Sequence, residues 1–433
     1  MFDVSPSRAG GADIVGPPTP NRSVAVIGAG IVGVSCAVFL QSEGHRVTLF
    51  DPRGPAGGAS SGNAGIVVAT SCLPIANPGV LRAIPKMLMD RNGSVTIRPT
   101  YFPYVLPWLL RLVLATRWEK IDRSAVALLS LSQDALTAYD ALLDIVPIPN
   151  IIHDVGKLTV YSTEAGFQAG EKSRLFARRY GMAIETLDQA GIHDLEPHLA
   201  PIFTRGTLQP HSRLVSNPKR LVETCAQHVL ARGGELRQVE VKRIESQGDE
   251  CAVISDEASS RFDAVVIAGG AWSDTLCRTL GFSVPLESER GYHLMLAKPD
   301  QSLGRPTLWG ERYINLSPME EGIRMTLGVE YAGRDAPPDF RLAYRLLGDA
   351  RIMLPSLSGR THGEWLGLRP SLPDSLPVLG RAPGHPNVIL AFGHNHIGLT
   401  LGPITGRVVA SLVSGKTPTV NLLPFSPLRS FFR

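Results

Sequence analysis

The sequence has few cysteines and no arrangement of them that could build a metal or redox site. There are five in 433 residues, and none belongs to a Cys-x-x-Cys pair or stands beside histidines at a zinc-binding spacing. Because their number is odd and they lie far apart, we expect reduced core cysteines, a cytoplasmic protein and no metal site. They are Cys36, Cys72, Cys225, Cys251 and Cys277.

A large excess of one charge is also missing. Lys and Arg number 43 against 39 Asp and Glu, which gives a net charge of +4, and no long basic run occurs. A nucleic-acid partner is therefore not expected. The chain is 44% hydrophobic and 19% charged, as in ordinary globular proteins, and is long enough for two domains. We expect a small molecule as its partner.

Long hydrophobic runs are absent as well. Residues 1–21 are rich in Gly, Pro and Ser without an apolar core, which predicts a flexible tail and not a signal peptide. The most apolar stretch, residues 101–116, is interrupted by Arg111 and two prolines and is shorter than the roughly 18 residues that a membrane-spanning helix needs. We expect a helix buried in the second domain. The alternative is a surface helix over residues 101–118 that rests, with its basic flank, on the cytoplasmic face of the inner membrane.

The order of the expected elements predicts a nucleotide-binding domain whose pieces alternate with those of a second domain. Residues 23–51 contain an apolar run, a helical pattern and a second apolar run, which together form half of a mononucleotide-binding unit. Residues 284–362 alternate like strands. The expected boundaries are 22–95, 205–283 and 363–433 for the nucleotide-binding domain, and 96–204 and 284–362 for the second domain.

A glycine-rich turn lies where such a unit binds phosphates. GAGIVG places Gly28, Gly30 and Gly33 in the GxGxxG spacing between the first strand and the helix. These glycines permit a tight turn, a close approach to a pyrophosphate and close packing of the helix on the strand. Asp51, 23 positions after Gly28, can accept a hydrogen bond from a ribose hydroxyl and disfavours the 2′-phosphate of NADP. The turn predicts a dinucleotide without separating NAD from FAD; the alternative is a turn selected for packing alone.

Three further segments favour a flavin. ASSGNAG, residues 59–65, follows the second strand and offers a small polar loop along a pyrophosphate. A second glycine turn stands at Gly269 and Gly270. GHNHIGLTLGPITG, residues 393–406, offers glycines and a helix start that can hydrogen-bond the polar edge of a flavin.

These motifs, in this order, resemble those of the D-amino acid oxidase superfamily of FAD-dependent oxidoreductases, and most closely the bacterial D-amino acid dehydrogenases of the DadA type. The resemblance spans about residues 22–415 and rests on GAGIVG with Asp51, SSGNAG, RGY (290–292), WLGLRPSLPDSLPVLG (365–380) and FGHNHIGLTLGPITG (392–406). It implies an α/β protein with a Rossmann-like FAD-binding domain of the glutathione-reductase/D-amino acid oxidase type. An α+β substrate domain built on an antiparallel sheet would be interleaved with it.

The resemblance also implies how the flavin is held. FAD would bind in an extended form with its isoalloxazine between the domains, and the backbone of Val241 would contact its adenine. Because no cysteine follows Cys277 to tether the ring, noncovalent FAD is expected. The residues expected to contact FAD are Gly28, Gly30, Ile31, Val32, Gly33, Asp51, Pro52, Ser60, Ser61, Asn63, Ala64, Gly65, Val241, Gly269, Gly270, Trp272, His394, Gly398, Leu399 and Thr400.

One arginine is the leading candidate for binding the substrate. By resemblance, Arg369 in GLRP is the family's carboxylate clamp, and a guanidinium can donate two parallel hydrogen bonds to a carboxylate. The alternative is a structural ion pair with Asp374 or Glu364.

Aromatic and imidazole side chains complete the expected catalytic set. Tyr292 and Tyr313 stand at positions that line the pocket in similar enzymes, although each could equally be a core tyrosine with a local partner. His394 and His396 lie in the flavin-proximal turn, where one could contact flavin or substrate, but the DadA type often has small residues there. His293 is a further departure from the pattern. The expected catalytic residues are Arg369, Tyr292, Tyr313 and His396.

The sequence therefore predicts FAD-dependent oxidation of the carbon–nitrogen bond of a small amino acid of the D-series or a cyclic imino acid such as D-hydroxyproline or D-proline. Hydride transfer from the α-carbon to flavin N5 needs positioning and exclusion of water but no strong acid or base. The electrons are expected to pass to quinone or another carrier of the respiratory chain. The alternatives are an oxygen-reducing oxidase of the glycine or sarcosine type and a flavin-binding relay subunit of a larger dehydrogenase complex.

Overall fold

The computed structural model of the chain describes residues 21–68, 74, 95–357 and 360–429. A six-stranded sheet has the strand order β10, β2, β1, β14, β21, β20. Neighbours from β10 to β21 are parallel, and β20 pairs antiparallel with β21 at the edge. This is the Rossmann-like sheet that the sequence predicts. Its strands are β1 (Ser23–Ile27), β2 (Arg46–Phe50), β10 (Glu235–Arg237), β14 (Ala264–Ile267), β20 (Val378–Ala382) and β21 (His385–Phe392).

The two faces of this sheet carry different layers. Val24 and Val26 of β1 belong to one hydrophobic core, and Ala25 and Ile27 belong to another, because successive side chains of a strand point to opposite faces. Helices cover the first face, and a small sheet with one helix covers the second. The first layer holds α1 (Ile31–Ser42), α9 (Pro218–Ala231) and α12 (Gly398–Val413); the second holds β11 (Val241–Gln247), β12 (Glu250–Ser255), β13 (Ser259–Phe262) and α10 (Ser273–Thr279).

Glycines allow α1 and α12 to pack closely. A Cβ at Gly406 would lie 2.7 Å from the carbonyl carbon of Ser35, and a Cβ at Gly402 would lie 2.9 Å from Cγ1 of Ile31. Gly402 is the fifth residue of α12, and Ile31 is the first residue of α1. The N-termini of the two helices therefore lie close together, at the end of the sheet where the parallel strands have their carboxyl ends.

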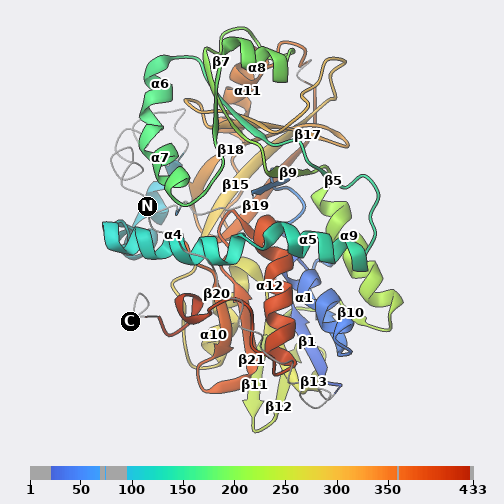
Figure 1. Ribbon diagram of the computed structural model, residues 1–433. Helices are drawn as coiled ribbons and strands as arrows, with labels where there is room; N and C mark the ends of the chain where they lie inside the picture. Colours follow the sequence, from blue (N-terminus) through green and yellow to red (C-terminus); the bar gives the residue numbers. More distant parts are fainter. Residues whose placement is uncertain (1–20, 69–73, 75–94, 358–359, 430–433) are drawn as a thin grey trace, which may run out of the picture.

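A larger sheet forms the other half of the molecule (Figure 1). Its order is β19, β15, β18, β17, β16, β6, β8, β7, with β4 beside β18, and all pairs are antiparallel except β16 with β6 and β4 with β18. Helix α11 packs on it. The elements are β4 (Val95–Ile97), β6 (Lys157–Tyr161), β7 (Glu185–Asp188), β8 (Arg205–Gln209), β15 (Glu287–Leu296), β16 (Thr307–Trp309), β17 (Ile314–Met319), β18 (Gly322–Tyr331), β19 (Thr361–Ser371) and α11 (Arg341–Met353), with α6 (Glu164–Ala169), α7 (Glu171–Arg179) and α8 (Gln189–Leu195) nearby.

Two helices cross the middle of the molecule between these halves (Figure 1). They are α4 (Trp118–Ser132) and α5 (Ala135–Ile145), and their apolar faces join the core that contains α1 and α12. The packing therefore differs from three expected boundaries. Residues 118–145 were expected in the second domain but pack on the nucleotide-binding half, whereas β8 and most of β19 were expected in the nucleotide-binding domain but are strands of the larger sheet. A third sheet of β3 (Ile66–Val68), β9 (Ser212–Val215) and β5 (Ile152–His153) lies at the junction.

Helix α3 (Phe102–Ala115) is not buried on all sides, which corrects the expectation of a core helix. Val105, Trp108 and Leu112 pack against Tyr331 and its neighbours, but the opposite face is open to solvent. The reason is that a helix packed on the outer edge of a sheet buries one stripe only. No helix among the described residues is both long and apolar enough to span a membrane.

The described cysteines agree with the expectation of reduced core residues. Cys36, Cys225, Cys251 and Cys277 are buried and free, and burial raises the pKa of the Cys225 thiol to about 12. Cys72 and the predicted tail of residues 1–20 lie outside the described residues.

Candidate active site

The turn after β1 leaves no room for a side chain at two of its positions. Gly28 has a φ of +109°, and a Cβ there would lie 2.3 Å from the carbonyl oxygen of Ala268. At Gly33 a Cβ would lie 1.8 Å from the carbonyl oxygen of Gly28. The first turn of α1 therefore sits directly on the end of β1, and its N-cap is a glycine without a side chain. Backbone N–H groups at this helix end are available to a phosphate.

Asp51 follows β2 and holds the turn from the side. Its Oδ2 accepts a hydrogen bond from the Ala29 N–H at 2.9 Å, and its Oδ1 accepts one from the Arg53 N–H at 2.9 Å. A carboxylate oxygen accepts two hydrogen bonds, so each oxygen retains a site for a ribose hydroxyl. The Arg53 guanidinium lies 4.4 Å from the centre of the Trp272 ring. Asp51, Arg53 and Trp272 all border the same cavity.

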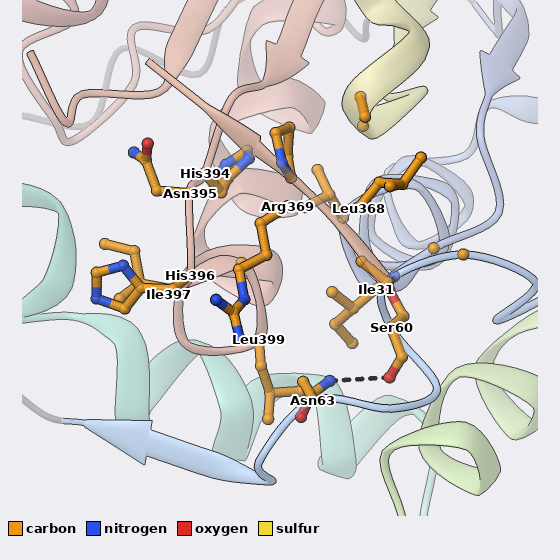
Figure 2. A pocket seen from close by; sticks show the side chains of 18 of the residues that line it. Ile31, Ser60, Asn63, Leu368, Arg369, His394, Asn395, His396, Ile397 and Leu399 are labelled. Carbon is orange, nitrogen blue, oxygen red and sulfur yellow. Dashed lines mark hydrogen bonds between the residues drawn. The ribbon is translucent and has the colours of Figure 1, made fainter. Parts of the chain in front are cut away.

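The loop of residues 59–65 is held by its own amide and by the larger sheet. Asn63 donates to the Ser60 carbonyl at 2.8 Å (Figure 2) and accepts from the Gly65 N–H at 2.8 Å. Ser60 Oγ accepts from the first N–H of α1, at 2.9 Å. Arg324 on β18 donates to the Asn63 carbonyl at 2.7 Å. The loop thus joins the phosphate-binding turn to the second half of the molecule.

A stacked pair also supports this loop. His293 on β15 hydrogen-bonds through Nδ1 to the Gly62 carbonyl at 2.8 Å, and its ring stacks on Trp365 with centroids 5.0 Å apart. A Cβ at Gly62 would lie 2.2 Å from the Trp365 ring. His293, noted above as a departure from the family pattern, therefore positions the loop.

A cavity of about 420 Å³ runs from the glycine turn to the larger sheet. It lies at the carboxyl ends of the parallel strands, where open α/β sheets bind ligands. The N-terminus of α12 opens onto it at Gly398, Leu399 and Thr400, and its N-cap residue makes no side-chain capping bond. Unpaired N–H groups and the positive end of the helix dipole therefore face the cavity.

These features fit FAD. The glycine turn, with no side chains in the way, and the open N-terminus of α1 match a pyrophosphate. The open N-terminus of α12 matches a flavin edge that carries negative charge, and the remaining acceptor sites of Asp51 match a ribose. The cavity wall includes 15 of the 20 residues expected at the cofactor: Gly28, Gly30, Ile31, Val32, Asp51, Ser60, Asn63, Ala64, Gly269, Gly270, Trp272, His394, Gly398, Leu399 and Thr400.

The other five expected cofactor residues are absent from this wall. Gly33 acts through helix packing, as its spacing predicts, and Pro52, Ser61 and Gly65 belong to the surrounding turns. Val241 begins β11 in the small sheet and contributes to the core beneath it. Its backbone contact with adenine stays a prediction.

Arg369 on β19 extends into the cavity, between His396 and the loop that carries Ser60 in the view of Figure 2. No described residue forms an ion pair or a hydrogen bond with its guanidinium. The two structural partners considered above are engaged elsewhere: Asp374 pairs with Arg429 at 2.7 Å, and Glu364 accepts from the Tyr344 hydroxyl. The guanidinium is thus available to a ligand.

Two residues of β15 define the position of this guanidinium. A Cβ at Gly291 would lie 2.5 Å from Nη2 of Arg369, so glycine provides the space that the guanidinium occupies. Glu289 lies opposite Arg369 in the strand register and is buried, with its carboxylate accepting from the Tyr331 hydroxyl at 2.8 Å. Burial lowers the pKa of Arg369 and raises that of Glu289, while each charge partly offsets the shift of the other.

The two histidines of the turn before α12 are both uncharged at neutral pH. Burial lowers the pKa of His394 to about 3, and its Nε2 lies 3.0 Å from Oγ1 of Thr405. His396 is open to the cavity. Desolvation by the surrounding protein, followed by the charges of Arg369 and Lys157, lowers its pKa to about 4.

The two tyrosines differ from the expected pocket roles. The Tyr292 ring borders the cavity, but its hydroxyl donates to Glu330 and accepts from Arg290 at 3.2 Å. The hydroxyl therefore behaves as in the alternative given above, a core tyrosine with local partners. Tyr313 does not line the cavity; it is 50% exposed, with a φ of +54°, in the turn between β16 and β17. Because this turn lies on the surface, the structure contradicts a place for Tyr313 in the pocket.

Several cavity residues were missed by sequence reasoning. Four such residues are Lys157, Met182, Gln209 and Trp365. Three of them lie on strands of the larger sheet, where an inward polar residue and a solvent-facing one give the same alternating pattern, and the fourth, Met182, lies in the connection between α7 and β7. In DVGKLTV, for example, nothing distinguishes Lys157 from a surface lysine.

Comparisons with known proteins agree with this geometry. Residues 23–412 match the family described as FAD dependent oxidoreductase. The chain is 35% identical over 416 residues to a D-amino-acid oxidase of Bradyrhizobium diazoefficiens (94% of this chain, 99% of the relative), and 28% identical over 415 residues to D-amino acid dehydrogenase 2 of Mesorhizobium japonicum (92% and 98%). The fold is also similar to that of glycine oxidase from Geobacillus kaustophilus, with a TM-score of 0.72, 24% identity and coverage of 94% and 98%.

Proposed function

The chain belongs to the family of FAD-dependent oxidoreductases, and from this premise we propose that it oxidises the carbon–nitrogen bond of a small D-amino acid or cyclic imino acid. The observation that carries the proposal is the unpaired guanidinium of Arg369 in the cavity that begins at the glycine turn. The names of the relatives, a D-amino-acid oxidase and D-amino acid dehydrogenases, support the same substrate class.

The residues of the chain would bind and orient the substrate. FAD, when bound, would supply the acceptor for the hydride that leaves the substrate α-carbon as the amine becomes an imine. Arg369 would donate two hydrogen bonds to the α-carboxylate, which fixes the orientation of the α-carbon. His394 and His396, both neutral, add no positive charge that would repel an amine. The first turn of α12 directs free N–H groups toward negative charge in the cavity.

The chain would hold FAD noncovalently. Asp51 would bind the ribose, the turn at Gly28 and Gly30 would admit the pyrophosphate, and the loop from Ser60 to Ala64 would follow it toward the larger sheet. No cysteine of the described residues borders the cavity.

Mixing with substrate in the absence of oxygen tests the proposal. The purified yellow protein is expected to lose its flavin absorbance with D-amino acids or D-proline. It should keep its absorbance with the L-enantiomers. A protein that stays yellow with a full panel of D-amino acids, D-hydroxyproline, sarcosine and glycine would contradict the proposal and point to a relay subunit.

The electron acceptor is proposed to be a quinone or another respiratory carrier. The rate at which air restores the yellow colour separates this from the second candidate, an oxidase, which the name of the 35% identical relative favours. Slow recovery in air together with fast recovery on adding a soluble quinone is expected. Fast recovery in air alone identifies an oxidase.

A peripheral membrane contact would bring the protein to a quinone on the cytoplasmic face of the inner membrane. The outer face of α3 and the start of α4 expose large apolar side chains beside Arg111 and Arg117. Apolar side chains flanked by cations suit the headgroup region of an anionic bilayer. The exposed apolar residues are Phe102, Tyr104, Leu106, Leu110, Val113, Leu114 and Trp118.

Cosedimentation with vesicles tests this contact. The protein should bind vesicles of phosphatidylglycerol and phosphatidylcholine more strongly than vesicles of phosphatidylcholine alone. The double variant Leu110→Ser, Leu114→Ser should lose binding, whereas Leu230→Ser, Ile352→Ser, which changes exposed apolar residues elsewhere, should retain it. Equal binding of the two variants would contradict the contact.

A further inference from the structure

A lysine from the larger sheet also lines the cavity. Lys157 is the first residue of β6, where Leu158 and Val160 point into the core and Lys157 lies on the opposite face of the strand. Its neighbour across the strand pair is Gln209 of β8, which borders the same cavity. The polar face of this strand is therefore turned toward the ligand space.

The ammonium group of Lys157 has no counter-ion among the residues that the structure describes. No described residue forms a salt bridge or a hydrogen bond with it. Burial lowers the pKa of Lys157, and no carboxylate of the described residues offsets that shift. Arg213, on β9 of the three-stranded sheet, differs in being paired with both Asp140 and Asp154. A cation left unpaired in a cavity is disfavoured unless a ligand brings the opposite charge.

Lys157 acts on the same part of the cavity as Arg369. After burial, the charges of Arg369 and Lys157 are the two influences that lower the pKa of His396. Among the described residues, Glu289 and Tyr331 raise the pKa of Arg369, and burial raises the pKa of Glu289 itself. The substrate end of the cavity thus presents two cations beside a neutral imidazole. A ligand with two carboxylates can place one on each cation.

We propose that Lys157 binds a second, side-chain carboxylate, so that the preferred substrates are dicarboxylic amino acids such as D-glutamate and D-aspartate. The inference rests on the proposed function and narrows its substrate class. Arg369 would bind the α-carboxylate and Lys157 the distal one, which leaves no buried charge uncompensated. The chemistry at the α-carbon is the same for acidic and neutral side chains.

Gln209 adds a hydrogen-bonding group beside Lys157. Its Oε1 is buried without a partner among the described residues, while its Nε2 lies 3.2 Å from the Met182 sulfur, a weak acceptor. A half-turn of the amide would place its NH₂ donors where Oε1 now lies, at the loss of this weak contact alone.

Matched pairs of substrates test the inference. D-glutamate and D-glutamine have almost the same shape and differ by one charge, as do D-aspartate and D-asparagine. For the wild-type protein, kcat/KM should be at least about tenfold higher for each acid than for its amide, since a charge-assisted hydrogen bond in a buried site is worth about that factor or more.

Variants at position 157 separate the role of the lysine from general effects. Lys157→Met should lower kcat/KM for D-glutamate by about 10- to 100-fold and for D-glutamine by less than about threefold. Lys157→Arg should restore part of the preference. Lys172→Met, on the exposed side of α7, is the control and should change neither substrate. Inhibition by carboxylic acids reports binding without chemistry. Glutarate, with two carboxylates, should inhibit the wild type more strongly than valerate, with one, and Lys157→Met should abolish that difference.

Each outcome has one interpretation. Equal losses for D-glutamate and D-glutamine in Lys157→Met would overturn the inference and indicate that the lysine supports the bound flavin. A wild type that oxidises neutral D-amino acids as well as acidic ones would also overturn it while the proposed function stands. If no amino acid bleaches the flavin, the proposed function itself fails.

Discussion

Two arginines on neighbouring strands have opposite surroundings. Arg290 on β15 is fully buried, with Nε 2.9 Å from Glu330 and Nη1 donating to the carbonyls of Gly333 and Ala336 at 3.1 and 2.7 Å. Arg369 on β19 has none of these partners. The contrast separates two roles that an arginine inside a protein can have: a guanidinium held by an ion pair and by backbone carbonyls stabilises the fold, and one whose donors face a cavity is kept for a ligand.

The difference comes from the backbone around each residue. The segment after β18 folds back so that its carbonyls surround Arg290, and Pro337 accepts from Nη2 at 3.1 Å. Around Arg369 the neighbouring strand offers Gly291, which has no side chain, and Glu289, which is turned to Tyr331. Substitution of each arginine should therefore affect different measurements.

The largest effect is expected for Arg369→Met. The substitution removes the carboxylate-binding fork, and kcat/KM for a D-amino acid should fall about a thousandfold, or about 4 kcal/mol in the transition state. The FAD content should change little. The free energy of unfolding should fall only modestly, because Arg369 makes no hydrogen bond or ion pair with a described residue, although Glu289 loses the nearby charge that lowers its pKa. Steady-state kinetics, flavin absorbance and chemical denaturation measure the three quantities. Retained activity would show that another group binds the carboxylate.

Arg290→Met should have the converse effect. It leaves Glu330 with one fewer cation and several buried carbonyls without donors, so the free energy of unfolding should fall by about 3 kcal/mol. Since Arg98 still pairs with Glu330 at 2.7 Å, the protein should fold. Chemical denaturation of the holoprotein measures the loss, and kcat/KM below the unfolding transition should stay within a few-fold. A large loss of activity at unchanged stability would place Arg290 in the active site.

The cofactor end of the cavity could be predicted from the sequence because consecutive residues build it. The GxGxxG turn, Asp51 and the loop from Ser60 to Ala64 lie within 37 residues of one another, and their backbone conformation follows from glycine positions that the structure places as expected. The order of strands and helices in this half also follows from apolar periodicity.

The substrate end could be predicted only in part. Arg369 was found through a family motif, but Lys157, Gln209 and Trp365 come from strands that tertiary packing alone brings to the cavity. Tyr313 is the converse case: the family resemblance placed it in the pocket, but its position in a hairpin turn directs it to solvent. An alternating pattern says which residues share a face of a strand but not whether that face meets water or a ligand.

The smallest effect in the comparison is expected for Gly291→Ala, which would move Arg369 without removing it. The added methyl would lie 2.5 Å from Nη2 and 2.6 Å from Cζ, and the far end of a flexible side chain can give way more easily than backbone. The φ of Gly291 is not positive, so alanine fits the strand. We expect a fall in kcat/KM of about tenfold, with a change in the free energy of unfolding below about 1 kcal/mol. Gly363→Ala on β19, where a Cβ would meet nothing within 4 Å, is the control and should leave both unchanged. Full activity in Gly291→Ala would mean that the guanidinium need not occupy the space above this glycine in order to bind substrate.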